Sequence, residues 1–386
     1  MKRTSIREFC IAAFVGTFLM LRCDVLGAKI LQPVDVFGAA SSSGFSYYGT
    51  SPESPDGTRV TYVVYHGDGS QELRLCNRDL TCHRKLADVK IGIHNGAKAF
   101  WIDNQRLAYV SDGLRVIDVD SGQLLYGPFP IRCETHYSVQ HTIVIYGQVG
   151  DEWAIWELDC NSGGIRKVTT LDALSADPSR LGVEELDEFT HIQPSADGTR
   201  VLFRYGPQDG KRMACLHMNG AQSLIAFPGN KPMHFLRYDN ETVMGVNWGF
   251  SAGDHNPNDR NEFQQAAKNR WFQRYEVDGG VIETLAGPIT HGAASPDRMW
   301  YAGETANYGE SPIRLALYAK GHTEPAAILM EHEFAKMTWR KRAHVNPAFS
   351  RDGRRVYFFR AASDDRFKAS FVGISRFVDE IQDTTD

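Results

Sequence analysis

The chain has 386 residues, a formal net charge of −5 and 23% charged residues, and its Lys and Arg are dispersed rather than clustered. Nucleic-acid-binding proteins need a basic patch or stripe, so this pattern excludes nucleic acid as an expected partner. The 35 glycines and 11% aromatic residues are typical of an all-β protein, and the length allows a sizeable core.

The N-terminal segment has the pattern of an export signal. Basic residues in "MKRTSIRE" precede the apolar run "FCIAAFVGTFLML", which is too short for a comfortable transmembrane helix. Small residues suited to cleavage follow, at Gly27 and Ala28. We expect a signal peptide at 1–28 and a single domain at 29–386. The mature protein is then a secreted or periplasmic monomer, with no membrane association after cleavage.

Export would permit disulfide bonds. Cys76 and Cys82 flank "NRDLT", where a hairpin would bring them across from each other. Cys133 and Cys160 are a second possible pair, which leaves Cys215 odd. The alternative, equally open from spacing alone, is that all five are buried, small apolar side chains.

One short unit recurs along the chain. It reads "SPDGTRVTYVVY" at 54–65, "SADGTRVLFRYG" at 195–206, "SPDRMWYAGE" at 295–304 and "SRDGRRVYFFRA" at 350–361. Asp-Gly forms a tight hairpin turn, because Gly accepts a positive φ and Asp caps its own backbone. The alternating apolar run that follows predicts a strand with one face buried.

Degenerate copies fill the intervals, and their spacing of about 40 to 55 residues is that of propeller blades. The sequence therefore predicts an all-β, seven-bladed β-propeller. Its blades are expected near 45–90, 94–130, 134–175, 191–230, 233–286, 289–332 and 343–378.

Histidines recur ahead of these turns. Each lies five to eight residues before the turn Asp of its copy: His191, His234, His291 and His344. His94 and His136 occupy loosely similar places. The segment before the innermost strand of a blade opens onto the central funnel, so these side chains should converge there. The open alternative is that each histidine is structural and bonds a neighbouring carbonyl group.

Converging imidazoles suit a metal site, a general base, or both. A Ser–His–Asp triad is a rival interpretation, but the G-x-S-x-G motif is absent from the sequence. Paired carboxylates for glycoside hydrolysis are conceivable, although nothing singles out one pair.

The order of these motifs resembles the oligogalacturonate lyases. The residues that carry the likeness are "HIQPSADGTRVLFRYGPQDGKRM", "MHFLRYDN", "THGAASPD" and "HVNPAFSRDG". These lyases are seven-bladed propellers that cleave uronate oligosaccharides by β-elimination. Ulvan lyases are a related possibility, and the turn motif alone is shared with TolB-like propellers.

The resemblance implies roles for individual residues. The base would be His234 and the assisting arginine Arg212. A divalent metal, manganese in the family, would be held by His291 and His344, with Asn346 as a further ligand. The family's last motif reads roughly Gln-x-x-His-x-His-Pro-x-Phe, and this chain departs from it at two positions: Lys341 replaces the glutamine and Asn346 the second histidine.

Four residues are assigned to substrate binding: His191, Gln193, Tyr48 and Lys341. Lys341 could also supply a positive charge in place of a metal. The expected function is a polysaccharide lyase of the kind that acts in pectin degradation, with an acidic oligosaccharide as its substrate. The alternative, from another class, is a non-catalytic TolB-like propeller that binds a protein or glycan at its funnel.

Overall fold

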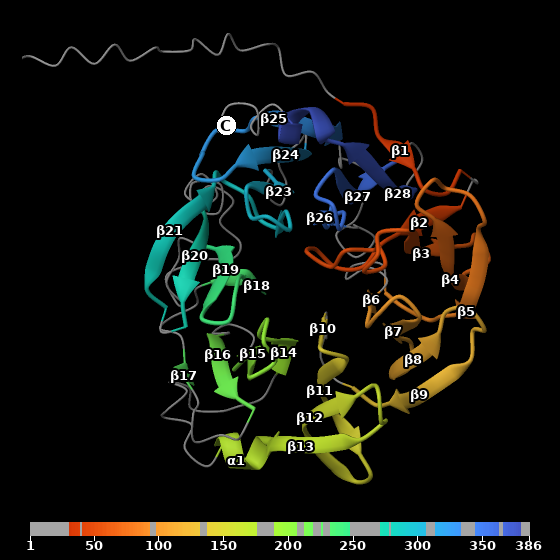
Figure 1. Cartoon of the computed structure of the whole chain (residues 1–386), viewed down its shortest axis with the longest axis vertical. Coiled ribbons are helices and arrows are strands. Elements are labelled where there is room, and N and C mark those ends of the chain that lie inside the picture. Colours follow the sequence, from red (N-terminus) through yellow and green to blue (C-terminus); the bar gives the residue numbers. More distant parts are fainter. Residues whose placement is uncertain are drawn as a thin grey trace, which may run out of the picture.

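The computed structural model describes residues 31–38, 41–92, 98–131, 137–175, 189–206, 212–218, 225–226, 232–247, 271–277, 279–305, 313–332, 344–362 and 366–379. Within these ranges the strands form seven four-stranded sheets arranged in a ring (Figure 1). The predicted all-β, seven-bladed β-propeller is therefore confirmed. No helix in the same ranges is long and apolar enough to cross a membrane.

Each sheet is one blade, and its first strand lies nearest the centre of the ring (Figure 1). Blade 1 has β2 (Ser42–Gly44), β3 (Arg59–Tyr65), β4 (Gln71–Asn77) and β5 (Arg84–Asp88). Blade 2 has β6 (Ala99–Trp101), β7 (Arg106–Val110), β8 (Leu114–Asp118) and β9 (Leu124–Phe129). Blade 3 has β10 (Ser138–Val139), β11 (Thr142–Val149), β12 (Glu152–Asp159) and β13 (Ile165–Thr170), followed by α1 (Leu171–Ser175).

The second half of the chain continues this pattern. Blade 4 has β14 (Phe189–Pro194), β15 (Arg200–Tyr205), β16 (Arg212–His217) and β17 (Ile225–Ala226). Blade 5 has β18 (Met233–Arg237), β19 (Thr242–Val246), β20 (Phe272–Glu276) and β21 (Val281–Ala286). Blade 6 has β22 (Gly292–Ala294), β23 (Trp300–Glu304), β24 (Ile313–Ala319) and β25 (Ala327–His332).

Blade 7 is built from both ends of the chain. It contains β26 (Ala348–Phe349), β27 (Arg355–Ala361) and β28 (Phe367–Gly373), and its outer strand is β1 (Val34–Asp35). Blade 7, expected near 343–378, has three strands in that range, and its fourth is the N-terminal strand, which pairs with β28. This pairing closes the ring.

The recurring turn is built as its residue types predict. In blade 1 the Ser54 hydroxyl donates to Asp56 at 2.5 Å, and it accepts from the Arg59 backbone N–H at 3.0 Å. Gly57 has a φ of +70°, and its N–H donates to the Ser54 carbonyl at 2.8 Å. The same Ser–Asp bond recurs at Ser195, Ser295 and Ser350.

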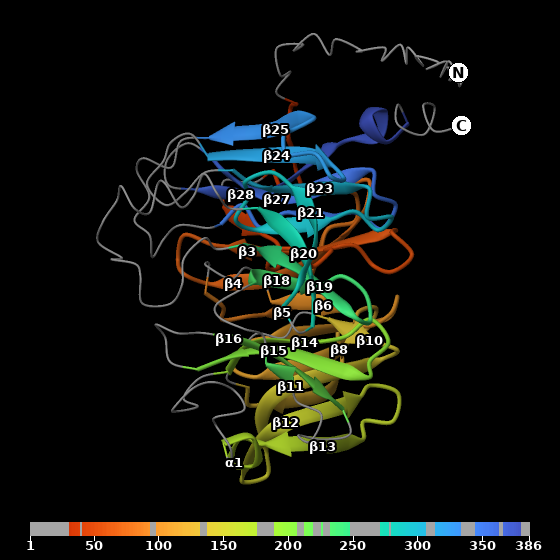
Figure 2. The ribbon, with the colours of Figure 1, turned by 90° about the vertical axis from the view of Figure 1, so that its left-hand side faces the viewer.

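The strands are more buried than their alternation predicts. In β3 every residue from Val60 to Tyr65 is buried, on both faces of the sheet. The expectation of one buried face was wrong because each blade of a closed ring packs between two neighbours. Figure 2 shows the ring edge-on, with the sheets of successive blades following one another along its length.

Of the two alternatives left open for Cys76 and Cys82, the structure shows no disulfide between them. Both cysteines are free; Cys76 is buried in the core, whereas Cys82 is exposed beyond the turn. Cys160 and Cys215 are also free and buried, as the alternative expected. Cys133 lies outside the described residues, as does the predicted signal peptide at 1–28.

A bidentate ion pair fastens the closing strand. The Arg360 guanidinium donates to both carboxylate oxygens of Asp35, at 2.8 and 2.6 Å, and the Ser370 hydroxyl adds a third bond at 2.8 Å. Partial burial raises the pKa of Asp35, but these hydrogen bonds outweigh it and hold the pKa below its usual value. Charge-assisted bonds of this geometry are stronger than ordinary surface pairs.

We expect Asp35→Ala to lower the free energy of unfolding by about 1–2 kcal/mol, because Arg360 and Ser370 lose their partner. Urea unfolding measures this loss at neutral pH. The difference in unfolding free energy between the wild type and Asp35→Ala should narrow as the pH falls below 3.8. The Asp35 carboxylate has a lowered pKa in the folded state, so its contribution to stability is lost as it becomes protonated. Asp88→Ala, which removes an exposed partner of Lys85, is the control and should change stability by at most about 0.5 kcal/mol. Equal losses in the two variants would contradict a special role for the Asp35 ion pair.

Candidate functional site

The blade-start histidines occupy one structural position. His191 and His291 each stand four residues before the turn serine of their blade. His234 stands four residues before Tyr238, whose N–H makes the equivalent turn bond. In blade 7 this position holds Asn346, and His344 lies two residues earlier.

The backbone at this position is unusual. The φ angles of His191, His234 and Asn346 are +55°, +46° and +44°, a region that few residues other than glycine adopt. In β14 and β18 this conformation coincides with a register shift against the next strand. The shift is a β-bulge, which redirects a side chain, and bulges are common beside functional sites.

The predicted convergence is confirmed for three histidines, His234, His291 and His344. The ring centroids of His234 and His291 are 4.1 Å apart, and those of His291 and His344 are 4.2 Å apart. His291 and His344 are buried, with 1% and 5% exposure, whereas His234 is partly exposed. Blades 5, 6 and 7 thus bring three imidazoles into one cluster.

A buried carboxylate that the sequence analysis did not identify completes this cluster. Glu304 ends β23 and is 4% exposed, and its backbone bonds Thr290 and His291 at the start of blade 6. Its Oε2 lies 3.4 Å from His291 Nδ1 and 3.9 Å from His344 Nδ1. Its Oε1 accepts the Val345 N–H at 2.5 Å, which joins blade 6 to blade 7.

The electrostatics of the cluster are set by burial and by these contacts. Burial raises the pKa of Glu304, but His291 and His344 outweigh it and hold the pKa well below its usual value. Burial lowers the pKa of His234 well below its usual value, and the charges of His291 and Arg204 lower it further. Glu304 is therefore ionised and His234 neutral near neutral pH.

The tautomer of His234 follows from its hydrogen bond. Its Nδ1 lies 3.1 Å from the carbonyl oxygen of Thr290. A carbonyl oxygen can only accept, so Nδ1 carries the proton and Nε2 carries the lone pair. This arrangement is suitable for a general base.

A loop from blade 1 packs two tyrosines against the histidines. The Tyr48 ring centroid lies 5.1 Å from His291 and 5.8 Å from His234, and that of Tyr47 lies 5.8 Å from His191. Both tyrosines are buried. Gly49 follows with a φ of +74°, and its N–H donates to the Pro347 carbonyl at 2.8 Å.

Other predicted site residues are placed differently. Gln193 is fully buried; its amide N–H donates to the Phe235 carbonyl at 3.2 Å and its oxygen accepts the Arg237 N–H at 3.0 Å. These bonds join blade 4 to blade 5, so the amide is engaged in a structural contact. Arg212 begins β16, and its side chain is outside the described part of the structure. So are Lys341, His94 and His136.

Arg204 is a second residue that the sequence analysis missed. It is 8% exposed in β15, and its charge acts on His234. A signal was available, because Arg204 and Glu304 both stand nine residues after their turn serine. The same position holds Val63 in blade 1 and Phe359 in blade 7. Charged residues at an otherwise apolar core position mark the site.

The residues present fit a divalent metal ion. Donor atoms of His291, Glu304 and His344 all lie within 4.8 Å of one another. Two imidazoles and a carboxylate are ligands for several divalent transition metals. Asn346 is 1% exposed, and neither atom of its amide has a hydrogen-bond partner within the described ranges. Such an orphaned amide is suitable as a further ligand.

The fold is similar to solved propellers. No protein-family model and no curated protein matches the chain. An oligogalacturonate lyase in complex with manganese has a TM-score of 0.63 and 14% identity, over 90% of this chain and 94% of that chain. An oligogalacturonate lyase from Vibrio parahaemolyticus has a TM-score of 0.63 and 13% identity, over 89% and 94%. A prolyl endopeptidase has a TM-score of 0.53 and 11% identity, over 86% of this chain and 47% of that chain.

These similarities confirm the expected likeness to oligogalacturonate lyase propellers at the level of fold. At such low identities the fold alone is shared, and the chemistry has to be argued from the site itself.

We expect Gly49→Ala to lower the melting temperature, because a Cβ there collides with Leu236 Cδ1 and comes 3.0 Å from Tyr137 Oη. The matched control is Gly321→Ala, with a φ of +76° and open space within 4 Å of the added Cβ. The control carries only the left-handed strain of about 1–2 kcal/mol. The Gly49 variant carries about 1–3 kcal/mol of overpacking in addition. Equal melting temperatures would contradict the close packing of this loop.

Proposed function

We propose that the protein is a lyase that cleaves uronate-containing oligosaccharides by β-elimination. The observation that carries the proposal is the neutral, partly exposed His234 beside the His291–Glu304–His344 cluster. The fold shared with oligogalacturonate lyases supports it. Pectin fragments are the corresponding substrate class, and a secreted or periplasmic location would bring the protein to them.

The first chemical requirement is a base. In the proposed reaction, Nε2 of His234 removes the proton from C5 of the uronate, which is weakly acidic because it is adjacent to the carboxylate. The electron pair forms the C4=C5 double bond, the C4–O4 bond breaks, and O4 leaves with the departing sugar. A neutral imidazole with a pKa below the working pH is present in its basic form.

The second requirement is positive charge on the substrate carboxylate. Without it the charge that develops at C5 is too costly in a partly dry site. Arg204 is a buried candidate, in addition to the sequence-predicted Arg212 and Lys341. A divalent metal held by His291, Glu304 and His344, with Asn346 as a fourth candidate ligand, would supply such charge when bound.

The third requirement is a proton for the leaving oxygen. Tyr48 lies against His234 and His291, so its phenol is a candidate donor, and water is the other. His191 lies at the edge of the same cluster, against Tyr47, and is a candidate contact for a second sugar.

We expect the wild-type protein to convert uronate oligosaccharides to unsaturated products, followed by their ultraviolet absorbance. His234→Gln should lower the rate by about 100-fold or more, since it removes the base. The control is His322→Gln, which changes an exposed histidine of blade 6 and should leave the rate unchanged. No product from a panel of uronate oligosaccharides would contradict the proposal and favour a non-catalytic binding propeller.

We expect one manganese ion to bind per chain. Glu304→Gln should lower the affinity for manganese by about tenfold or more, because this ligand loses its negative charge. Isothermal titration with MnCl₂ measures both. The matched control is Glu331→Gln, which removes the charge of a carboxylate that pairs with Arg314 at the surface and should leave the affinity for manganese unchanged. A wild-type protein without a manganese site, or equal affinities in the two variants, would contradict the metal assignment.

A further inference from the structure

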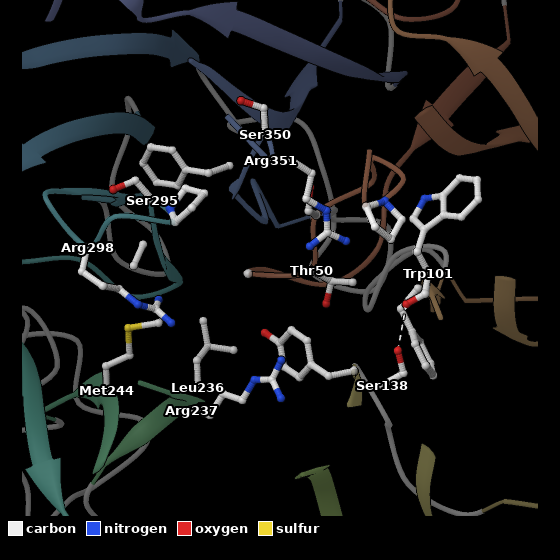
Figure 3. Close-up of a pocket in the computed structure, with 18 of the residues that line it drawn as sticks. Thr50, Trp101, Ser138, Leu236, Arg237, Met244, Ser295, Arg298, Ser350 and Arg351 are labelled. Atoms are coloured by element: carbon white, nitrogen blue, oxygen red, sulfur yellow. Dashed lines mark hydrogen bonds between the residues drawn. The ribbon is translucent and has the colours of Figure 1, made fainter. Parts of the chain in front are cut away.

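A second site lies at the opposite end of the inner strands. A cavity of about 320 Å³ opens among the ends of the inner strands of blades 2, 3, 5, 6 and 7 and the loop after Gly49. Figure 3 shows Arg237, Arg298 and Arg351 extending into this cavity from three sides, with Thr50 and Ser138 on its wall. Its volume is that of a small ligand site.

The three guanidinium groups are bonded only in part. Arg237 donates to the Ser195 carbonyl at 3.2 Å, Arg298 to the Tyr238 carbonyl at 3.0 Å, and Arg351 to the Glu53 carbonyl at 3.2 Å. A guanidinium has five N–H donors, so each arginine retains donors beyond these bonds.

Carboxylates balance these charges only in part: burial lowers the pKa of Arg351, and the charge of the nearby Glu53 opposes this shift without forming an ion pair with the guanidinium. No Asp or Glu is among the residues that line the cavity, and none of the three arginines forms an ion pair with a carboxylate of the described ranges. The nearby Glu53 uses Oε1 for Tyr357 and Arg78 and Oε2 for the backbone N–H of Arg351. Three positive charges therefore face one partly enclosed space.

Their mutual repulsion is visible at Arg237. Burial lowers its pKa, Tyr137 opposes this shift, and the charges of Arg298 and Arg351 lower the pKa further. Grouping like charges away from water is costly unless a counter-charge is supplied.

Two of the arginines depart from the turn motif. Arg298 takes the place of the glycine found at positions 57, 198 and 353, and it retains a left-handed φ of +62°. Such strain in a bulky residue costs about 1–3 kcal/mol and is typical of functional positions. Arg351 stands where two other copies have proline. The turn is held by its Ser and Asp, so neither arginine is needed to form it.

This cavity is distinct from the histidine cluster. Arg237 lies three residues after His234 in β18, a separation of at most roughly 10 Å along a strand, which the bulge at His234 shortens. The loop with Tyr47, Tyr48 and Gly49 lies between the two: its tyrosines contact the histidines, whereas Gly49 and Thr50 line the cavity.

We propose that this cavity binds a small, multiply charged oxyanion through Arg237, Arg298 and Arg351. The ligand carries carboxylate or phosphate groups, and its negative charge offsets the three guanidinium groups. The site is independent of the proposed lyase reaction, and its test needs no turnover.

The experiment measures the melting temperature and isothermal titration heats with four probes: citrate, inorganic phosphate, galacturonate and the neutral sugar galactose. We expect citrate or phosphate, which carry several negative charges, to raise the melting temperature above that in sodium chloride of equal ionic strength, since a bound ligand stabilises the folded state. Galactose should have no effect, and galacturonate, with one charge, should have a smaller effect than the multiply charged probe that binds. Citrate without phosphate would identify carboxylates as the ligand group, phosphate without citrate would identify phosphate, and galacturonate alone would contradict a multiply charged ligand.

Arg298→Gln and Arg351→Gln should each lower the affinity for the probe that binds by about tenfold or more. The control Arg314→Gln removes one positive charge from the surface of β24 and should keep the affinity within about twofold. His234→Gln, in the histidine cluster, should also retain binding. Absence of any anion-specific shift in the wild type would overturn the proposal. So would an equal loss in Arg314→Gln, or a loss confined to His234→Gln, which would move the anion to the histidine cluster.

Discussion

The arrangement of the inner strands depends on the burial of one carboxylate. An ionised Glu304 away from water is costly unless every acceptor position is satisfied. Its two oxygens are met by the Val345 N–H and by His291 and His344, so the end of β23, the start of blade 6 and the start of blade 7 must keep their relative positions. The charge that shapes the site thus also fixes two blades to each other.

The fold was predictable because its repeat is local. A Ser-x-Asp-Gly turn followed by an apolar run predicts a hairpin from about twelve consecutive residues. Several copies of this unit in one chain can close into a ring of blades. The closing strand has no such signature. Val34 and Asp35 form a two-residue strand that is specified by its partners in β28 and by Arg360, far away in sequence.

The candidate site was predictable where it follows the repeat. His234, His291 and His344 converge because they stand at corresponding ends of successive inner strands. Arg204 and Glu304 were missed because they belong to strands, Arg204 within β15 and Glu304 at the end of β23, where alternation draws attention to apolar neighbours. The signal appears only when the repeat copies are aligned, because Arg204 and Glu304 then occupy the position that holds Val63 and Phe359 in other blades.

The closing strand has a consequence for how the protein reaches its folded state. Asp35 and Arg360 are separated by 325 residues, so the last blade stays one strand short until the two ends of the chain meet. A contact at this separation carries a large loop-closure entropy and stabilises only a chain whose other blades are already ordered. Val34 and Asp35 are therefore needed to complete blade 7, and synthesis must reach β28 before the N-terminal strand has an edge on which to dock.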